Sequence, residues 1–483
     1  MKKAVVVILS IILFAAPFAA VFSLAADVKN VYEHTFTAAL YDKYDLLYGT
    51  EGRKIVVVGG SSVCFGLDSA LLEEETGRSV VDFGLYATLG TKVMLDLSQR
   101  AIKEGDTVVI APELDSQTLS KYFNQQAVLE ALDGRYDMVR DIGFDNYDEI
   151  AGGFLTYLAT AAGFKQQGIS PNPSGIYNRA SFNKYGDIAT PREENVMTLG
   201  YDANRPVELS PDIVSDDFID YLNGYIDKCL AKGADVWFSF CPINKSGLAK
   251  DTTDESIYSF YSYMAGKLHC RIISNINDYI LDEKYFYDTN FHLNDVGVRI
   301  RTETLAGDIL RAEGNNKPVG PAYPVETEVP TETGTQEQTT PEPTPGDDMS
   351  DGVFMYRSFG KGLAIEGVKD DAKGMTSADI PREYNGVRIY AILADAFAGC
   401  EKLAVITMHD NISFVENNAF NIPSLTKLYI DAPDAEKIEA GDKIFGDRTN
   451  VEIYLPDYDS FESFVSGYWW GIYSSNMKIA DGE

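Results

Sequence analysis

Cysteine and histidine are scarce in this chain of 483 residues. Its five cysteines are odd in number and no two form a C-x-x-C pair, so the sequence predicts neither a disulfide framework nor a zinc ribbon. Its four histidines form no H-E-x-x-H motif, and we expect no metal site and no cofactor. Chemistry that needs an imidazole therefore has few candidates, which are His34, His269, His292 and His409.

Basic residues are also few. The chain has 41 Lys and Arg against 73 Asp and Glu, and 41 − 73 gives a formal charge of −32. Phosphate binding needs clustered basic side chains, so this balance argues against nucleic acid as a partner and against an anionic lipid surface. With 45% hydrophobic residues the chain can fold, and its length predicts two or three domains.

One long apolar run occurs, within residues 1–26. It follows Lys2 and Lys3 and ends in small residues, as a signal peptide does. It also reaches the roughly 20 residues that a membrane-spanning helix needs. The segment is therefore either a cleaved signal peptide or a membrane anchor, and both alternatives predict an extracellular protein, secreted or anchored at the N-terminus.

Residues 27–311 alternate buried strands with helical patterns. The strand-like runs are apolar throughout, which is typical of a parallel sheet covered on both faces. We therefore predict a five-stranded, doubly wound α/β domain, with residues 114–205 as an insertion or cap. The predicted strands are 55–60, 79–84, 106–113, 234–242 and 271–276, and the predicted helices are 67–76, 89–104, 212–232, 252–268 and 295–311.

Residues 312–350 are dominated by Pro, Thr and Glu, which predicts a disordered linker. A repeat follows within residues 351–483, where Ala396-Phe397 recurs as Ala419-Phe420, 23 residues later. A period in the twenties with one strand per turn is typical of leucine-rich repeats, and flanking segments must close the ends. The pair Trp469-Trp470 is either an exposed glycan platform or, our preferred interpretation, one such end.

This region resembles the leucine-rich repeats of BspA-type surface proteins. Residues 396–403 fit their A-F-x-x-C-x-x-L core, whereas the second copy has Pro423 at the cysteine position. The resemblance implies a short solenoid that could contact a glycan or a host protein.

A nucleophile candidate follows the first strand, in the segment Gly59-Gly60-Ser61-Ser62. A serine there would lie at the carboxyl edge of the sheet, at a helix N-terminus. The alternative is an ordinary loop and helix cap. Asp288 and His292 follow the last strand and would meet the serine at that edge, as a base and its orienting carboxylate.

These residues resemble the motifs of the SGNH (GDSL-type) hydrolase superfamily of esterases and acyltransferases. Its G-D-S-x-x-x-G block is similar to residues 60–66, which implies Ser62 as nucleophile and Ser61 as runner-up. Its N-x-G block is similar to residues 82–84, which implies an oxyanion donor at Gly84. Its D-x-x-H-L block is similar to residues 288–293, which implies the Asp288–His292 pair.

Three departures separate the chain from that pattern. The G-x-N-D block is absent, and Glu113 stands there as either a substitute polar group or a strand-end carboxylate. Asp288 and His292 are four residues apart instead of three, with Asn290 between them as a candidate substrate contact, and Asp82 replaces Asn. Similar departures occur in relatives that acylate envelope polymers, such as alginate O-acetyltransferases.

We therefore expect an extracellular SGNH-type serine esterase or O-acyltransferase that acts on acyl groups of cell-envelope carbohydrate. The sequence does not choose between water and a sugar hydroxyl as acceptor. The transferase alternative implies a membrane partner that exports acyl groups. The other hypothesis is a non-catalytic surface protein that binds glycan or host protein through its repeats.

Overall fold

The computed structural model describes residues 27–314 and 349–480 with short gaps, together with residues 21, 23 and 25. The predicted N-terminal signal or anchor and the predicted linker lie largely outside these residues. The gaps are 143–146, 169, 174, 360–361, 442 and 467–468.

The described residues divide into two compact units. The first contains most of the chain up to α10 (Asp295–Gly314), and the second contains the C-terminal residues from 349. Two short segments, 173–177 within the predicted insertion and 196–206 at its end, belong to the second unit. There Asn417 donates its backbone N–H to Asn204 Oδ1 over 3.1 Å.

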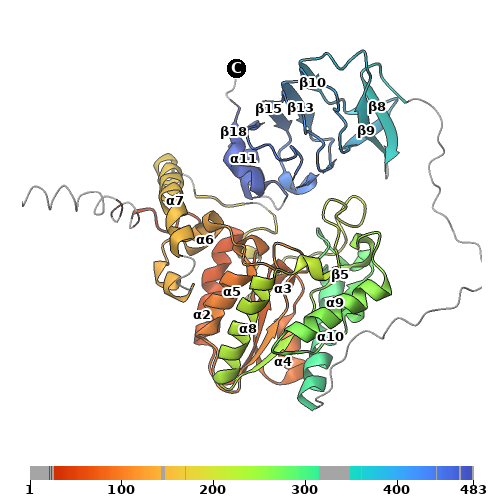
Figure 1. The fold of residues 1–483 in the computed structure, drawn as a ribbon. Helices are drawn as coiled ribbons and strands as arrows, with labels where there is room; N and C mark the ends of the chain where they lie inside the picture. Colours follow the sequence, from red (N-terminus) through yellow and green to blue (C-terminus); the bar gives the residue numbers. More distant parts are fainter. Residues whose placement is uncertain are drawn as a thin grey trace, which may run out of the picture. The chain divides into compact units, whose positions relative to one another are not determined.

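A five-stranded sheet with all neighbouring strands parallel forms the centre of the first unit (Figure 1). The strand order is β2-β1-β3-β4-β6, so β1 lies between β2 and β3. The predicted parallel α/β sheet is confirmed. The strands are β1 (Lys54–Gly59), β2 (Ser79–Gly84), β3 (Thr107–Ile110), β4 (Asp235–Phe238) and β6 (Arg271–Ile272).

Helices cover both faces of this sheet. All six residues of β1 are buried, and because side chains alternate along a strand, both of its faces need a cover. On one face Ile55 and Val57 join a core with Leu72 of α4 (Ser69–Thr76) and residues of α10. The other helices of the unit that follow the predicted pattern are α5 (Thr91–Gln99), α8 (Asp216–Ala231) and α9 (Asp254–Lys267).

A helix that precedes β1 was not predicted. α2 (Ala39–Gly49) buries Lys43, whose Nζ lies 2.9 Å from Asp82 Oδ1 at the end of β2. Both side chains are fully buried. The charge pair therefore ties α2 to the sheet.

The predicted insertion contains α6 (Gln125–Leu132) and α7 (Tyr147–Gln167). Its aromatic residue Tyr157 is fully buried and stacks on Tyr32 with ring centroids 6.0 Å apart. Core packing therefore accounts for this ring. A small parallel pair, β5 (Ile243–Asn244) and β7 (Ile280–Leu281), lies outside the main sheet.

The second unit is built from two sheets made mainly of parallel strands. One has the order β10-β13-β15-β17-β18, and the other has β16-β14-β12-β9-β8, with β11 paired to β12. Only the β8–β9 and β11–β12 pairs are antiparallel in the described part of this unit. The strands and the helix are β8 (Phe354–Phe359), β9 (Gly362–Val368), β10 (Ser377–Asp379), β11 (Glu383–Tyr384), β12 (Val387–Ile392), β13 (Val405–His409), β14 (Phe414–Val415), β15 (Lys427–Asp431), β16 (Glu439–Ala440), β17 (Glu452–Leu455), α11 (Tyr458–Ser466) and β18 (Met477–Ile479).

The repeated Ala-Phe positions lie on top of one another in this core. Phe397 and Phe420 have ring centroids 6.0 Å apart, and Phe445 continues the column 6.1 Å from Phe420. Trp470 is fully buried and donates Nε1–H to the Ile438 carbonyl over 2.8 Å. Because both Trp469 and Trp470 are buried, they do not form an exposed platform.

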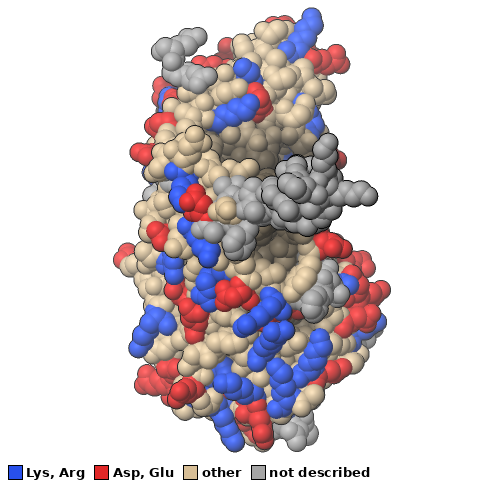
Figure 2. Space-filling view, turned by 90° about the vertical axis from the view of Figure 1, so that its left-hand side faces the viewer, with Lys and Arg blue, Asp and Glu red and all other residues tan. Residues whose placement is uncertain are grey.

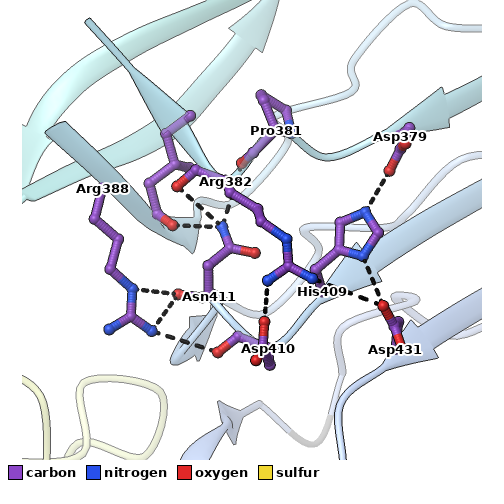
Figure 3. Close-up of polar contacts among 9 residues, drawn as sticks. Asp379, Pro381, Arg382, Arg388, His409, Asp410, Asn411 and Asp431 are labelled. Carbon is purple, nitrogen blue, oxygen red and sulfur yellow. Dashed lines mark hydrogen bonds and ion pairs between the residues drawn. The ribbon is translucent and has the colours of Figure 1, made fainter. Parts of the chain in front are cut away.

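A buried amide connects successive turns of the second unit. Asn411 Nδ2 donates to the carbonyl oxygen of Ile389 over 2.7 Å and to that of Pro381 over 3.2 Å (Figure 3). Beside it, His409 lies between Asp379 and Asp431 of the neighbouring strands. Asn411 thus supplies one donor to carbonyl oxygens of two separate segments.

Candidate active site

Three side chains from the two ends of the first unit form a hydrogen-bonded chain. His292 Nε2 lies 2.8 Å from Ser61 Oγ, and His292 Nδ1 lies 2.8 Å from Asp288 Oδ1. All three residues are at most 3% exposed. A carboxylate only accepts, so Asp288 places the proton on Nδ1 and leaves Nε2 free to accept from the serine hydroxyl.

Ser61 owes its position to the turn that leaves β1. Gly60 ends this turn, and α3 (Ser61–Cys64) begins at the serine itself. A Cβ at Gly60 would lie 2.4 Å from Glu113 Oε2, so a larger residue there would displace the Glu113 carboxylate. The serine is thereby held at the carboxyl edge of the sheet.

A closed loop presents Asp288 and His292. Tyr287 N donates to the His292 carbonyl over 2.9 Å, and the bridge between Phe286 and Leu293 closes the loop. Inside it, Thr289 Oγ1 accepts the backbone N–H of His292 over 2.9 Å. This turn accommodates the four-residue spacing and still brings the carboxylate to the imidazole.

The imidazole also has an aromatic support. The ring of Phe65 stacks on His292 with centroids 4.0 Å apart and an interplanar angle of 8°. Phe65 is fully buried and in turn faces the guanidinium of Arg192, 5.4 Å from its ring centroid. Phe65 restricts the imidazole to one orientation. Phe65 lies within the motif of residues 60–66, but nothing in the sequence indicated that its ring would support the imidazole.

Of the two candidate serines, only Ser61 has its hydroxyl in contact with the imidazole. Ser62 was the presumed nucleophile, yet its Oγ is buried and has no hydrogen-bond partner among the described residues. Neighbouring residues of a helix point about 100° apart, so the two hydroxyls cannot both face His292. The serine that contacts the imidazole is Ser61.

Gly84 does not offer its N–H in the manner expected. It donates to Asp82 Oδ1 over 2.9 Å, so the aspartate at the family's asparagine position engages it. Asn290 packs against Gly247, where an added Cβ would lie 2.4 Å from Asn290 Oδ1. Its backbone carbonyl accepts from Asn244 N over 2.9 Å. These contacts give Asn290 a role in holding the loop.

Glu113 belongs to the site. It follows β3, is 3% exposed, and its Oε1 accepts the backbone N–H of Ser62 over 2.6 Å. The same oxygen lies 3.1 Å from Ser61 Oγ. Burial raises the pKa of Glu113, and the charge of Asp115 raises it further.

Another buried cation, Arg301, lies close to the serines. Arg301 of α10 is 2% exposed and places Nη1 3.5 Å from the Ser62 carbonyl oxygen. Burial lowers the pKa of this guanidinium. Within the described residues no cluster of His, Cys, Asp and Glu could hold a metal ion.

Charges of both signs are interspersed over the face of the molecule in Figure 2. None of the helices in the described ranges is both long and apolar enough to cross a bilayer.

Searches for relatives found neither a matching protein-family model nor a matching curated protein.

Proposed function

We propose that the chain is an SGNH-type serine esterase or O-acyltransferase with Ser61 as its nucleophile. The observation that carries this proposal is the chain of contacts from Ser61 through His292 to Asp288. A serine hydroxyl, an imidazole and a buried carboxylate in this order are the parts that acyl transfer needs.

In this mechanism Ser61 Oγ attacks the acyl carbonyl while its proton passes to His292 Nε2. The leaving alcohol takes that proton and an acyl-enzyme remains. An acceptor then attacks the acyl-enzyme and releases Ser61. If the acceptor is water the protein is an esterase, and if it is a sugar hydroxyl the protein is a transferase. Asp288 holds the imidazole tautomer and stabilises the imidazolium that forms in both steps.

The substrate class follows from the SGNH resemblance and from the N-terminal apolar segment. We infer an extracellular protein, secreted or anchored, that acts on acylated cell-envelope carbohydrate. In the transferase case a membrane protein that exports acyl groups would supply the donor.

Hydrolysis of p-nitrophenyl acetate by the full chain tests the proposal, with Ser61→Ala compared with Ser62→Ala. Ser61→Ala should lose about 10³-fold or more in kcat/KM, because no other group supplies the nucleophile. Ser62→Ala is the matched control one residue away, and it should retain activity because its hydroxyl makes no contact in the site. Equal activities would contradict the proposal.

A binding role for the second unit is the other candidate. Its supporting observation is a row of stacked rings, Tyr429 and Tyr454, with centroids 4.8 Å apart on neighbouring strands. Both are half-buried, with Lys427 Nζ 5.2 Å from the Tyr454 ring centroid. Such rings stack well on sugars. We infer that the proposed leucine-rich-repeat solenoid binds a glycan or a host protein here, and Tyr429→Ala should abolish retention on a glycan array.

A further inference from the structure

We propose that Glu113 is an internal occupant of the oxyanion position, which holds the site in a resting state until an acyl group displaces it. This inference rests on the proposed function and adds a regulatory contact to it. It also accounts for the carboxylate at the place where the family's asparagine block is missing.

One carboxylate oxygen of Glu113 contacts both a backbone donor and the nucleophile. Glu113 Oε1 lies 2.6 Å from Ser62 N and 3.1 Å from Ser61 Oγ. The oxygen of a bound acyl group must lie close to a backbone donor, and the carbonyl carbon must be within reach of the nucleophile. One oxygen of Glu113 already fills a position that meets both conditions, so substrate and Glu113 compete for it.

Glu113 and His292 compete for the hydroxyl proton of Ser61. Ser61 has one proton to donate, and both Glu113 Oε1 and His292 Nε2 are within hydrogen-bond distance of its oxygen. When Glu113 is ionised, donation to the carboxylate turns the proton away from the base. When Glu113 occupies this position, it therefore lowers the reactivity of Ser61 and also blocks the backbone N–H of Ser62.

The charge of Glu113 also opposes the attack on the acyl group. Negative charge develops on the substrate oxygen during attack, and a carboxylate at that place repels it in a buried site. Burial and Asp115 raise the pKa of Glu113, which reduces the charged fraction at low pH. The titratable and charged groups that face it are Asp115, His292, Cys64, Cys241 and Arg301.

The test measures the second-order rate of labelling of the full chain by a fluorophosphonate, in which Ser61 Oγ bonds to phosphorus and fluoride leaves. Glu113→Gln keeps the shape without the charge, and Glu113→Ala empties the position. Both should react about 10- to 100-fold faster than wild type, because one oxyanion donor contributes about 10²–10³ in rate. Asp115→Asn is the comparison, since it removes a nearby carboxylate that does not contact Ser62 N; because the Asp115 charge raises the pKa of Glu113, this variant keeps Glu113 ionised and should label no faster than wild type.

Opposite outcomes separate the possibilities. Slower labelling of both Glu113 variants, with wild-type unfolding temperatures, would overturn this inference and leave the proposed function standing. No labelling of any form would overturn both. The labelling rate of Glu113→Gln divided by that of wild type should also decrease as the pH falls, because Glu113 of the wild type takes up a proton. A ratio that does not change with pH would contradict the role of the Glu113 charge.

Discussion

Ser61 Oγ and His292 Nε2 lie 2.8 Å apart, although 231 positions of chain separate the two residues. The parallel sheet accounts for this approach, because the turn after β1 and the loop before α10 both reach its carboxyl edge. Ser61 begins a helix and His292 lies in a closed loop, so each is held by local structure.

Replacing Asp288 by Asn should impair catalysis through the imidazole. The amide can donate to Nδ1, which would move the ring proton to Nε2 and leave no acceptor for Ser61. We expect kcat to fall by about 10²–10⁴ with little change in KM. Steady-state kinetics on p-nitrophenyl acetate provides the measurement, and a kcat within twofold of wild type would refute the orienting role.

Replacing Lys43 by Met should destabilise the first unit. Asp82 would remain fully buried without its cation, and uncompensated buried charges cost about 3–5 kcal/mol. Urea unfolding measures the loss. The double variant Lys43→Met/Asp82→Asn removes both charges and should recover part of the lost stability. An equal loss of stability in the single and the double variant would contradict a stabilising role of the Lys43–Asp82 ion pair.

The stability of the first unit should depend on pH through Asp187. Burial raises its pKa from 3.8 to about 7. Between these values the unfolded chain releases the proton and the folded chain keeps it, so the free energy of unfolding falls as the pH rises, by up to about 4 kcal/mol. Above about pH 7 the effect is constant.

Asp187→Asn removes this titration. Its unfolding free energy relative to wild type should therefore increase between pH 4 and pH 7. Thermal unfolding in that range checks the sign, and parallel pH curves for the two proteins would contradict it.

Asn411→Ala should destabilise the second unit by about 1–3 kcal/mol, because the buried carbonyl of Ile389 and the half-buried carbonyl of Pro381 would lose their donor. The neighbouring Asp410→Ala loses only an exposed ion pair with Arg382, and about 1 kcal/mol or less is expected. Chemical unfolding of both variants makes the comparison. Similar losses would show that the amide has no special role.

Sequence patterns predicted the parallel sheet of the first unit and the helices between its strands. The continuous apolar run of β1 is what a strand buried on both faces requires, and the 23-residue spacing of Ala396 and Ala419 reflects turns that cover one another. The contact of Lys43 with Asp82 was not predictable, since α2 shows no pattern that marks one lysine as buried. Asp82 within an apolar strand was the available signal that a cation had to lie nearby.

The choice between the two serines needed the structure. Ser61 and Ser62 are adjacent and share the same motif, and their different directions come from the rotation per residue at the start of α3. Glu113 was visible as a departure from the family motif. Its hydrogen bond to Ser62 N depends on how closely β1 and β3 end beside each other, which no local pattern encodes.

The most direct test of the account locates the covalent adduct of a fluorophosphonate on the full chain by peptide mass spectrometry. The account predicts modification of Ser61, absent in Ser61→Ala and strongly reduced in His292→Ala, with Ser62 unmodified. An adduct on Ser62, or the same adduct yield in His292→Ala as in wild type, would contradict it.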